Sequence, residues 1–192
     1  MAFKLIVIGT SLGGFHALKT VLADLPKDFQ LPIVVVQHRS FEESELFAPL
    51  LARYVQLPVV EVDDKLEIKE GQILVGPSNY HVLIDDAHLA LSMDAPVLRA
   101  RPSIDVLFES AAESFGEGVL GVLLTGMSND GVAGLKRIKE CGGFTIVQDP
   151  ITAEGRIMPE AAIESAVPDK ILPLESIASF LMDLSVGQRM KA

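Results

Sequence analysis

Residues 4–14 read KLIVIGTSLGG, an aliphatic run that stops at Gly9 and continues into a polar, glycine-rich turn. The run from Lys4 to Ile8 predicts a buried strand. Apolar residues then recur at positions 15, 18, 22 and 25, a spacing that predicts an amphipathic helix. Ser11 therefore lies in a tight strand-to-helix turn, where its hydroxyl is held clear of the sheet. Glycines on both sides let backbone N–H groups approach a reacting atom, which is the geometry of a nucleophile.

The same alternation of strands and helices continues along most of the chain. Runs rich in Val and Ile predict further buried parallel strands at 32–37, 59–62, 119–124 and 144–148. Helical patterns lie near 13–25, 43–54, 104–115, 131–140, 159–165 and 174–184. This order predicts a doubly wound α/β fold, with a mostly parallel, Rossmann-like sheet between two layers of helices. Residues 72–75 and 81–92 look extended, the second broken by a turn at Asp85-Asp86, and predict a small antiparallel hairpin at the sheet edge.

Length and composition limit the class of protein. The chain has 192 residues, of which 49% are hydrophobic, and this predicts a single domain over residues 1–192. The net charge of −10 argues against a nucleic-acid partner. The single cysteine, Cys141, fits a reducing cytosol, and the glycines after it are typical of a helix end. We see neither a signal peptide nor an apolar run of about 20 residues, and so expect a cytoplasmic protein without membrane insertion.

Three predicted strands are followed by residues that carry hydrolytic chemistry. Ser11 follows the first strand, His38 follows the second, and Asp130 lies in the turn 125–131 after the strand at 119–124. Ligands of such folds bind at the carboxyl ends of the strands, so these side chains are expected on one face. A hydroxyl needs a base to become a nucleophile, and the base needs a carboxylate to fix its tautomer. The sequence therefore predicts a catalytic triad of Ser11, His38 and Asp130.

Each of these residues also has a purely structural explanation when it is taken alone. Ser11 could cap a helix, His38 could be an ordinary strand-end residue, and Asp130 could cap a helix. Their convergence favours the triad. An oxyanion hole is then also required, and the turn 125–131 offers the backbone N–H of Met127, while the turn after Ser11 could supply another.

Three other kinds of site fit the sequence less well than a catalytic triad does. A dinucleotide-binding turn at Gly9–Gly14 would need glycine in place of Ser11 and an acidic residue in place of Gln37-His38. Residues 9–13 match the G-x-S-x-G elbow of α/β-hydrolases, but in that fold several strands precede the serine and the acid precedes the histidine. His81, His88 and Asp85 form no tight metal-ligand pattern. We therefore expect no cofactor and no metal.

With the triad in view, the chain resembles the catalytic domain of the chemotaxis protein-glutamate methylesterases, the CheB family. The matching stretches are IGTSLGG at 8–14, QH at 37–38, RPSIDVLF at 101–108, LTGMSNDG at 124–131 and MPEAAI at 158–163. The resemblance implies that Ser11 is the nucleophile, His38 the general acid/base and Asp130 its orienting carboxylate, with Met127 giving an oxyanion N–H. It also implies hydrolysis of glutamate γ-methyl esters on the cytoplasmic helices of chemoreceptors and, in some members, deamidation of receptor glutamines.

Two departures from the family pattern bear on function. The residue after the nucleophile is usually a small hydroxyl residue, whereas here it is Leu12, which removes a polar group near the oxyanion. The usual enzymes also carry an N-terminal receiver domain, whereas this chain begins at the first catalytic strand. Either the receiver is absent or it lies outside this chain, and a stand-alone protein would need control by expression, by a separate partner such as a response regulator, or by localisation. Two other functions remain open: a serine esterase or amidase for a different ester, and a catalytically silent adaptor that binds receptors.

Overall fold

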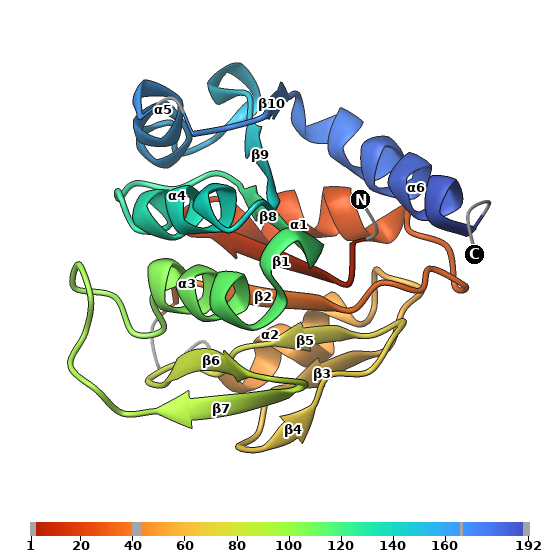
Figure 1. The fold of residues 1–192 in the computed structure, drawn as a ribbon, viewed down its shortest axis with the longest axis horizontal. Coiled ribbons are helices and arrows are strands. Elements are labelled where there is room, and N and C mark those ends of the chain that lie inside the picture. The colour runs from red at the N-terminus through yellow and green to blue at the C-terminus, as the bar shows by residue number, and fades with distance from the viewer. Residues whose placement is uncertain (1–2, 40–43, 166, 190–192) are drawn as a thin grey trace.

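The computed structural model describes residues 3–39, 44–165 and 167–189 (Figure 1). Within these residues, seven strands form one sheet in the order β10-β9-β8-β1-β2-β5-β3, and every pairing between neighbours is parallel. The strands are β1 (Leu5–Thr10), β2 (Ile33–Gln37), β3 (Val59–Glu61), β5 (Ile73–Val75), β8 (Val119–Leu123), β9 (Phe144–Gln148) and β10 (Lys170–Leu172). The mostly parallel sheet expected from the aliphatic runs is confirmed.

Helices cover both faces of this sheet, as a doubly wound fold requires. Successive residues of β1 point to opposite faces, so that Ile6 and Ile8 belong to one hydrophobic core and Leu5 and Val7 to the other. The first core is closed by α1 (Gly14–Ala23), α2 (Ser44–Leu51) and α6 (Leu174–Arg189). The second is closed by α3 (Ile104–Phe115), α4 (Val132–Glu140) and α5 (Ile157–Glu164). None of the described helices is long and apolar enough to cross a membrane.

A second, antiparallel sheet packs against α3. It pairs β6 (His81–Asp85) with β7 (His88–Ser92), and β7 with the short β4 (Leu66–Glu67). The predicted hairpin with its turn after Asp85 is therefore confirmed, and Asp86 adopts the left-handed conformation that such turns use (φ 52°). Val82, Ile84 and Leu89 turn their side chains into the core that α3 closes.

The antiparallel expectation is wrong for residues 72–75. Strand β5 pairs in parallel with β2 on one side and with β3 on the other, so it belongs to the main sheet. All three of its residues are buried, and this is the pattern of a strand covered on both faces. Its length of three residues is too short for the sequence to distinguish it from a hairpin strand.

The strand order changes direction at β1, which makes this strand a topological switch point. From β1 it runs through α1 to β2 on one side, whereas β8, reached only after α3, pairs with β1 on the other side. The carboxyl ends of β8, β1 and β2 are therefore adjacent, and a crevice opens there in folds of this type.

Candidate active site

Ser11, His38 and the turn after β8 lie at this switch point and are joined through their backbones. The Ser11 N–H donates to the Thr125 carbonyl (2.9 Å), and the His38 N–H donates to the Thr10 carbonyl (3.0 Å). The Thr125 hydroxyl donates to the Leu12 carbonyl (2.8 Å). These bonds fix the spacing of three loops that are far apart in the sequence.

The turn that carries Ser11 depends on its two glycines. Gly13 adopts a left-handed backbone conformation (φ 77°) just before α1 begins. At Gly14, a Cβ atom would collide with the side chain of Gln37. Both positions therefore require glycine, and they let the chain turn sharply while Ser11 stays partly exposed beside the helix N-terminus.

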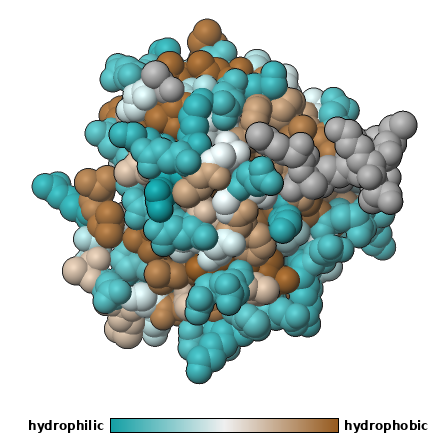
Figure 2. Space-filling model, viewed as in Figure 1, coloured by the Kyte–Doolittle hydropathy of each residue, from teal (hydrophilic) through white to brown (hydrophobic). Residues whose placement is uncertain are grey.

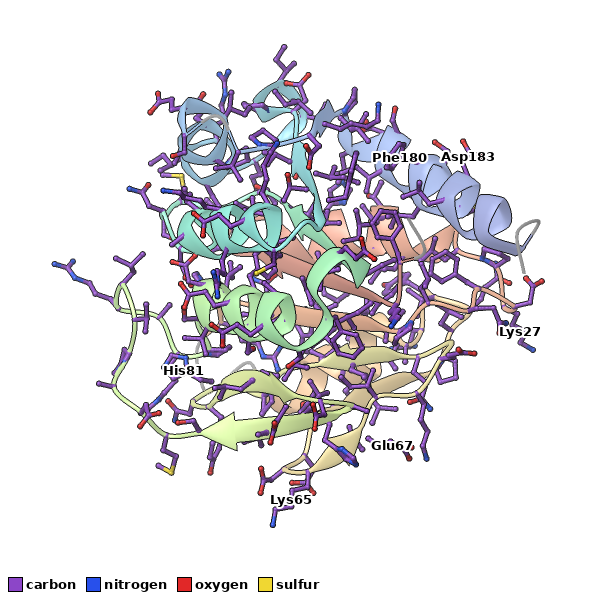
Figure 3. The ribbon with its side chains drawn as sticks, in the orientation of Figure 1. Lys27, Lys65, Glu67, His81, Phe180 and Asp183 are labelled. Atoms are coloured by element: carbon purple, nitrogen blue, oxygen red, sulfur yellow. The ribbon has the colours of Figure 1, made fainter. Side chains whose placement is uncertain are left out.

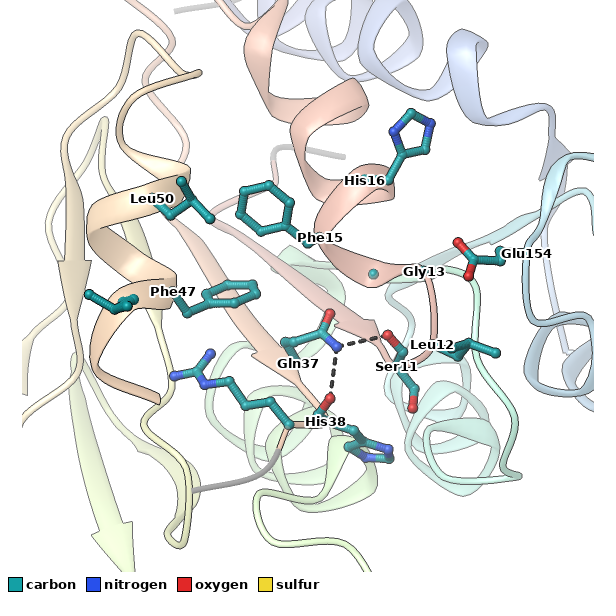
Figure 4. A pocket seen from close by; sticks show the side chains of 13 residues that line it. Ser11, Leu12, Gly13, Phe15, His16, Gln37, His38, Phe47, Leu50 and Glu154 are labelled. Carbon is teal, nitrogen blue, oxygen red and sulfur yellow. Dashed lines mark hydrogen bonds between the residues drawn. The ribbon is translucent and has the colours of Figure 1, made fainter. Parts of the chain in front are cut away.

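His38 and Asp130 are in direct contact. The His38 Nε2 atom lies 2.7 Å from Asp130 Oδ2, and the exposed fractions of the two side chains are 15% and 0%. In this arrangement the Nε2–H of a neutral imidazole donates to the carboxylate, which leaves Nδ1 free to accept a proton. Figure 4 shows the Ser11 hydroxyl on the side of its turn that faces the His38 ring. The side chains of Ser11 and His38 are not hydrogen-bonded to each other in the described structure.

Asp130 is held as a carboxylate by the start of α3. Its Oδ1 accepts hydrogen bonds from the Ser103 hydroxyl (2.8 Å) and the Asp105 N–H (3.0 Å), and its Oδ2 accepts from the Ile104 N–H (2.7 Å) and from His38. Burial alone would raise the pKa of Asp130, but the bond from His38 and those from α3 outweigh it and lower the pKa below its ordinary value. An ionised Asp130 can therefore stabilise a protonated His38.

A second buried carboxylate, Asp105, supports the loop that carries Asp130. Its Oδ1 accepts hydrogen bonds from the Gly131 N–H (2.9 Å) and the Gly134 N–H (2.7 Å). Burial, with a smaller contribution from the charge of Asp130, raises the pKa of Asp105 to about 6 even though these bonds act to lower it. Asp105 thus positions the loop after β8. Near neutral pH its buried carboxylate is ionised, and this lowers the stability of the folded protein.

This raised pKa predicts an unusual dependence of stability on pH. The folded protein binds the Asp105 proton more tightly than the unfolded chain does, so the stability contribution of this group falls as pH rises from 3.8 to about 6. Asp105→Asn keeps an Oδ1 acceptor for both glycine N–H groups and removes the charge. We expect the variant to be more stable than the wild type by on the order of 2 kcal/mol at about pH 7.5, and by much less at about pH 4.

Urea unfolding of both proteins at the two pH values measures this difference. Taking the difference between the proteins removes the contributions of carboxylates that do not interact with Asp105. An equal change in the free energy of unfolding at both pH values would contradict the prediction.

Gln37 connects the backbones of the candidate nucleophile and base. Its Nε2 donates to the carbonyls of Ser11 (2.7 Å) and His38 (2.8 Å), as Figure 4 shows. Its Oε1 is buried and has no partner among the described residues. Sequence reasoning assigned no role to Gln37, Ser103 or Asp105. Their place in the sequence gave a partial signal, because Gln37 directly precedes His38 and Ser103 directly precedes the helix predicted at 104–115.

Backbone donors for an oxyanion are present on two sides of Ser11. Gly126 is so close to the nucleophile that a Cβ atom there would lie 3.0 Å from the Ser11 Cβ, and Met127 follows it directly. The N–H groups of Met127 and Leu12 have no acceptor among the described residues, whereas the Gly126 N–H donates to the Gly155 carbonyl (2.8 Å). The unpaired groups are thus available to a ligand at Ser11.

A groove of about 940 Å³ opens from Ser11 between α1 and α2 (Figure 4). Its walls are mainly apolar and include Phe15, Leu46, Phe47 and Leu50. The Leu12 side chain also lines this groove and is 50% exposed.

The other residues considered from the sequence lie away from this groove. Cys141 ends α4 and is followed by Gly142 in a left-handed conformation (φ 85°), which confirms the predicted helix end. His81 is buried and bonded to the backbone, and His88 is exposed on β7.

Comparisons with known proteins agree with this fold. The family model described as CheB methylesterase matches residues 6–181. A protein of Leptospira interrogans, named putative protein-glutamate methylesterase/protein-glutamine glutaminase, is 45% identical over 96% of both chains. A protein of Anaeromyxobacter dehalogenans with the same activities in its name is 41% identical, and this chain spans 53% of its length. The crystal structure of the Thermotoga maritima CheB methylesterase catalytic domain superposes with a TM-score of 0.91, at 32% identity over 96% of this chain and all of that one.

Proposed function

This chain belongs to the CheB methylesterase family, and from that premise we propose that it hydrolyses glutamate γ-methyl esters of a chemoreceptor with Ser11 as the nucleophile. His38 is the general acid/base in this proposal, and Asp130 is the carboxylate that orients it. The observation that carries the proposal is the 2.7 Å bond between His38 and Asp130 at the strand ends that also hold Ser11.

Each chemical step of the proposal follows from these roles. The Ser11 hydroxyl attacks the ester carbonyl and gives its proton to His38 Nδ1, while Asp130 stabilises the imidazolium. The negative oxygen of the tetrahedral intermediate accepts hydrogen bonds from the backbone N–H groups of Met127 and Leu12. His38 then returns the proton to the departing methoxide, and methanol leaves. Water, deprotonated by His38, attacks the acyl-enzyme, and His38 returns the proton to the Ser11 oxygen as the ester bond to the enzyme breaks. The glutamate leaves and ionises to the carboxylate, and the enzyme is ready for another cycle.

The same residues can deamidate a glutamine. The leaving group is then ammonia, to which His38 donates the proton, and the acyl-enzyme is the same. The names of the relatives carry both activities, which supports including deamidation in the proposal. We place the reaction in the cytoplasm, because the substrate helices of chemoreceptors are cytoplasmic in this family. We also propose that residues 1–192 form one domain.

Two measurements on the wild-type protein test the proposal. Chemoreceptor carrying radiolabelled methyl esters is expected to release labelled methanol, and a fluorophosphonate is expected to modify the protein once, at the peptide that contains Ser11. Hydrolysis of small esters without methanol release would favour an esterase for a different substrate. Binding to receptor without fluorophosphonate labelling would favour a silent adaptor.

A further inference from the structure

An arm, residues 93–102, projects from the molecule between β7 and α3. Figure 1 shows it as the long green loop at the left, and Figure 2 shows it as a narrow projection with hydrophilic surface at its end. At its tip Val97 and Ala100 exchange both backbone hydrogen bonds (3.1 and 2.8 Å). The two residues between them, Leu98 and Arg99, are both left-handed (φ 46° and 66°), which non-glycine residues rarely are. Both side chains are exposed at this tight turn.

The arm is fixed at its base. The buried His81 accepts a hydrogen bond at Nδ1 from the Ser103 N–H (3.2 Å) and donates from Nε2 to the Ala95 carbonyl (3.2 Å); Figure 3 labels it at the base of the arm. Arg101 Nη1 donates to the Met93 and Asp94 carbonyls (2.9 and 3.1 Å). Because the Ser103 hydroxyl also donates to Asp130, hydrogen bonds link the base of the arm to the candidate active site.

Between the arm and His38 lies a second pocket of about 380 Å³. Its described lining includes Arg39, Arg99 and Arg101, and no acidic residue. Elsewhere on the described surface, four cationic side chains pair with carboxylates, in Lys69–Glu67, Arg137–Glu113, Lys139–Asp169 and Arg156–Glu160, whereas others are dispersed singly. In a chain with a net charge of −10, this concentration of positive charge is a local exception.

The guanidinium groups of this pocket are incompletely paired. Arg99 has no ion pair or hydrogen bond within the described part of the chain, and Arg101 meets only backbone carbonyls while its buried Nε has no described partner. Arg39, 3% exposed, donates from Nη2 to the Gly76 carbonyl (2.8 Å) and lies 4.0 Å from Glu61. Guanidinium groups bind carboxylates with paired, charge-assisted hydrogen bonds.

We propose that this pocket is a carboxylate subsite that binds a glutamate next to the reacting ester on the substrate protein, with Arg99 as the contacting residue. The inference rests on the proposed function. Each turnover converts a neutral ester into a carboxylate, so a substrate with several esters acquires ligands for the subsite as it is hydrolysed. The subsite also offsets the repulsion between an acidic substrate and an enzyme of net negative charge.

Two helical peptides test the subsite, each with one glutamate γ-methyl ester, flanked in one by glutamates and in the other by glutamines. The wild type is expected to hydrolyse the glutamate-flanked peptide with a kcat/KM about tenfold higher than for the glutamine-flanked peptide. The difference should come from a lower KM, because charge-assisted hydrogen bonds strengthen binding. Arg99→Asn, which tolerates the left-handed turn, is expected to abolish this preference and leave hydrolysis of the glutamine-flanked peptide unchanged.

Arg137→Gln is the matched control. It changes the net charge equally, but Arg137 is on α4 and does not line the pocket, so the preference is expected to remain. Equal hydrolysis of both peptides by the wild type would overturn the subsite and leave the proposed function standing. An equal loss on both peptides in Arg99→Asn would also overturn it, since that result indicates a structural role. Hydrolysis of neither peptide by the wild type would overturn the proposed function, and the subsite with it.

Discussion

Replacing Ser11 by alanine is expected to lower kcat for methanol release about 10⁴- to 10⁶-fold, because no acyl-enzyme can form without the hydroxyl. The remaining activity would come from the oxyanion donors and the positioned substrate acting on water. The Ser11 side chain has no hydrogen bond to another described residue, so its loss should leave the fold intact. Labelled methanol released from methylated receptor gives the rate, and thermal unfolding gives the stability.

Ser165→Ala is the matched control for this substitution. Ser165 lies at the end of α5 and is exposed, and within the described residues its hydroxyl bonds only to the Ala161 carbonyl. Its replacement should leave kcat at the wild-type value. The catalytic assignment would be wrong if Ser11→Ala kept more than about a tenth of wild-type kcat, because loss of a nucleophile costs far more than tenfold. A much lower unfolding temperature in Ser11→Ala would instead assign the loss of activity to a loss of structure, and the Ser11 hydroxyl would then have a structural role.

The main features of the fold could be predicted because they depend on local patterns. The strand and helix at 5–23 follow from an aliphatic run, two glycines and a helical spacing of apolar residues. The convergence of Ser11, His38 and Asp130 at one end of the sheet followed from a topological rule about strand ends. Such rules need only the order of elements along the chain.

What the sequence did not predict depends on contacts between distant segments. Asp105 and Gly131 are 26 residues apart, and nothing in either segment indicates that a carboxylate bonds that backbone. The tip of the arm gave no signal for a different reason. Leu98 and Arg99 adopt left-handed conformations without glycine or asparagine, the residues by which such turns are recognised. Strand β10 has only three residues, of which Lys170 and Ile171 are exposed, so its pattern is weak.

Replacing Asp130 by asparagine is expected to reduce both activity and stability. The carboxylate accepts two hydrogen bonds at each oxygen, and an amide must place an NH₂ group at one of these positions. That group would face the Ile104 N–H in one orientation and the Asp105 N–H in the other. We expect a loss of about 2–4 kcal/mol in the free energy of unfolding. The midpoint of thermal unfolding should fall by about 5–12 °C.

The activity of Asp130→Asn should fall about 10³- to 10⁴-fold in kcat, since His38 loses both its orienting acceptor and the charge that stabilises the imidazolium. Asp105→Asn is the matched control. It makes the same chemical change at a neighbouring buried carboxylate, but it keeps the hydrogen bonds that the Asp105 Oδ1 accepts. The two aspartates should therefore respond in opposite directions in thermal unfolding near pH 7.5, although both are buried and adjacent. If Asp130→Asn unfolded at the wild-type temperature, the four donors around Asp130 would not require a carboxylate, and its role in holding His38 would have to be abandoned.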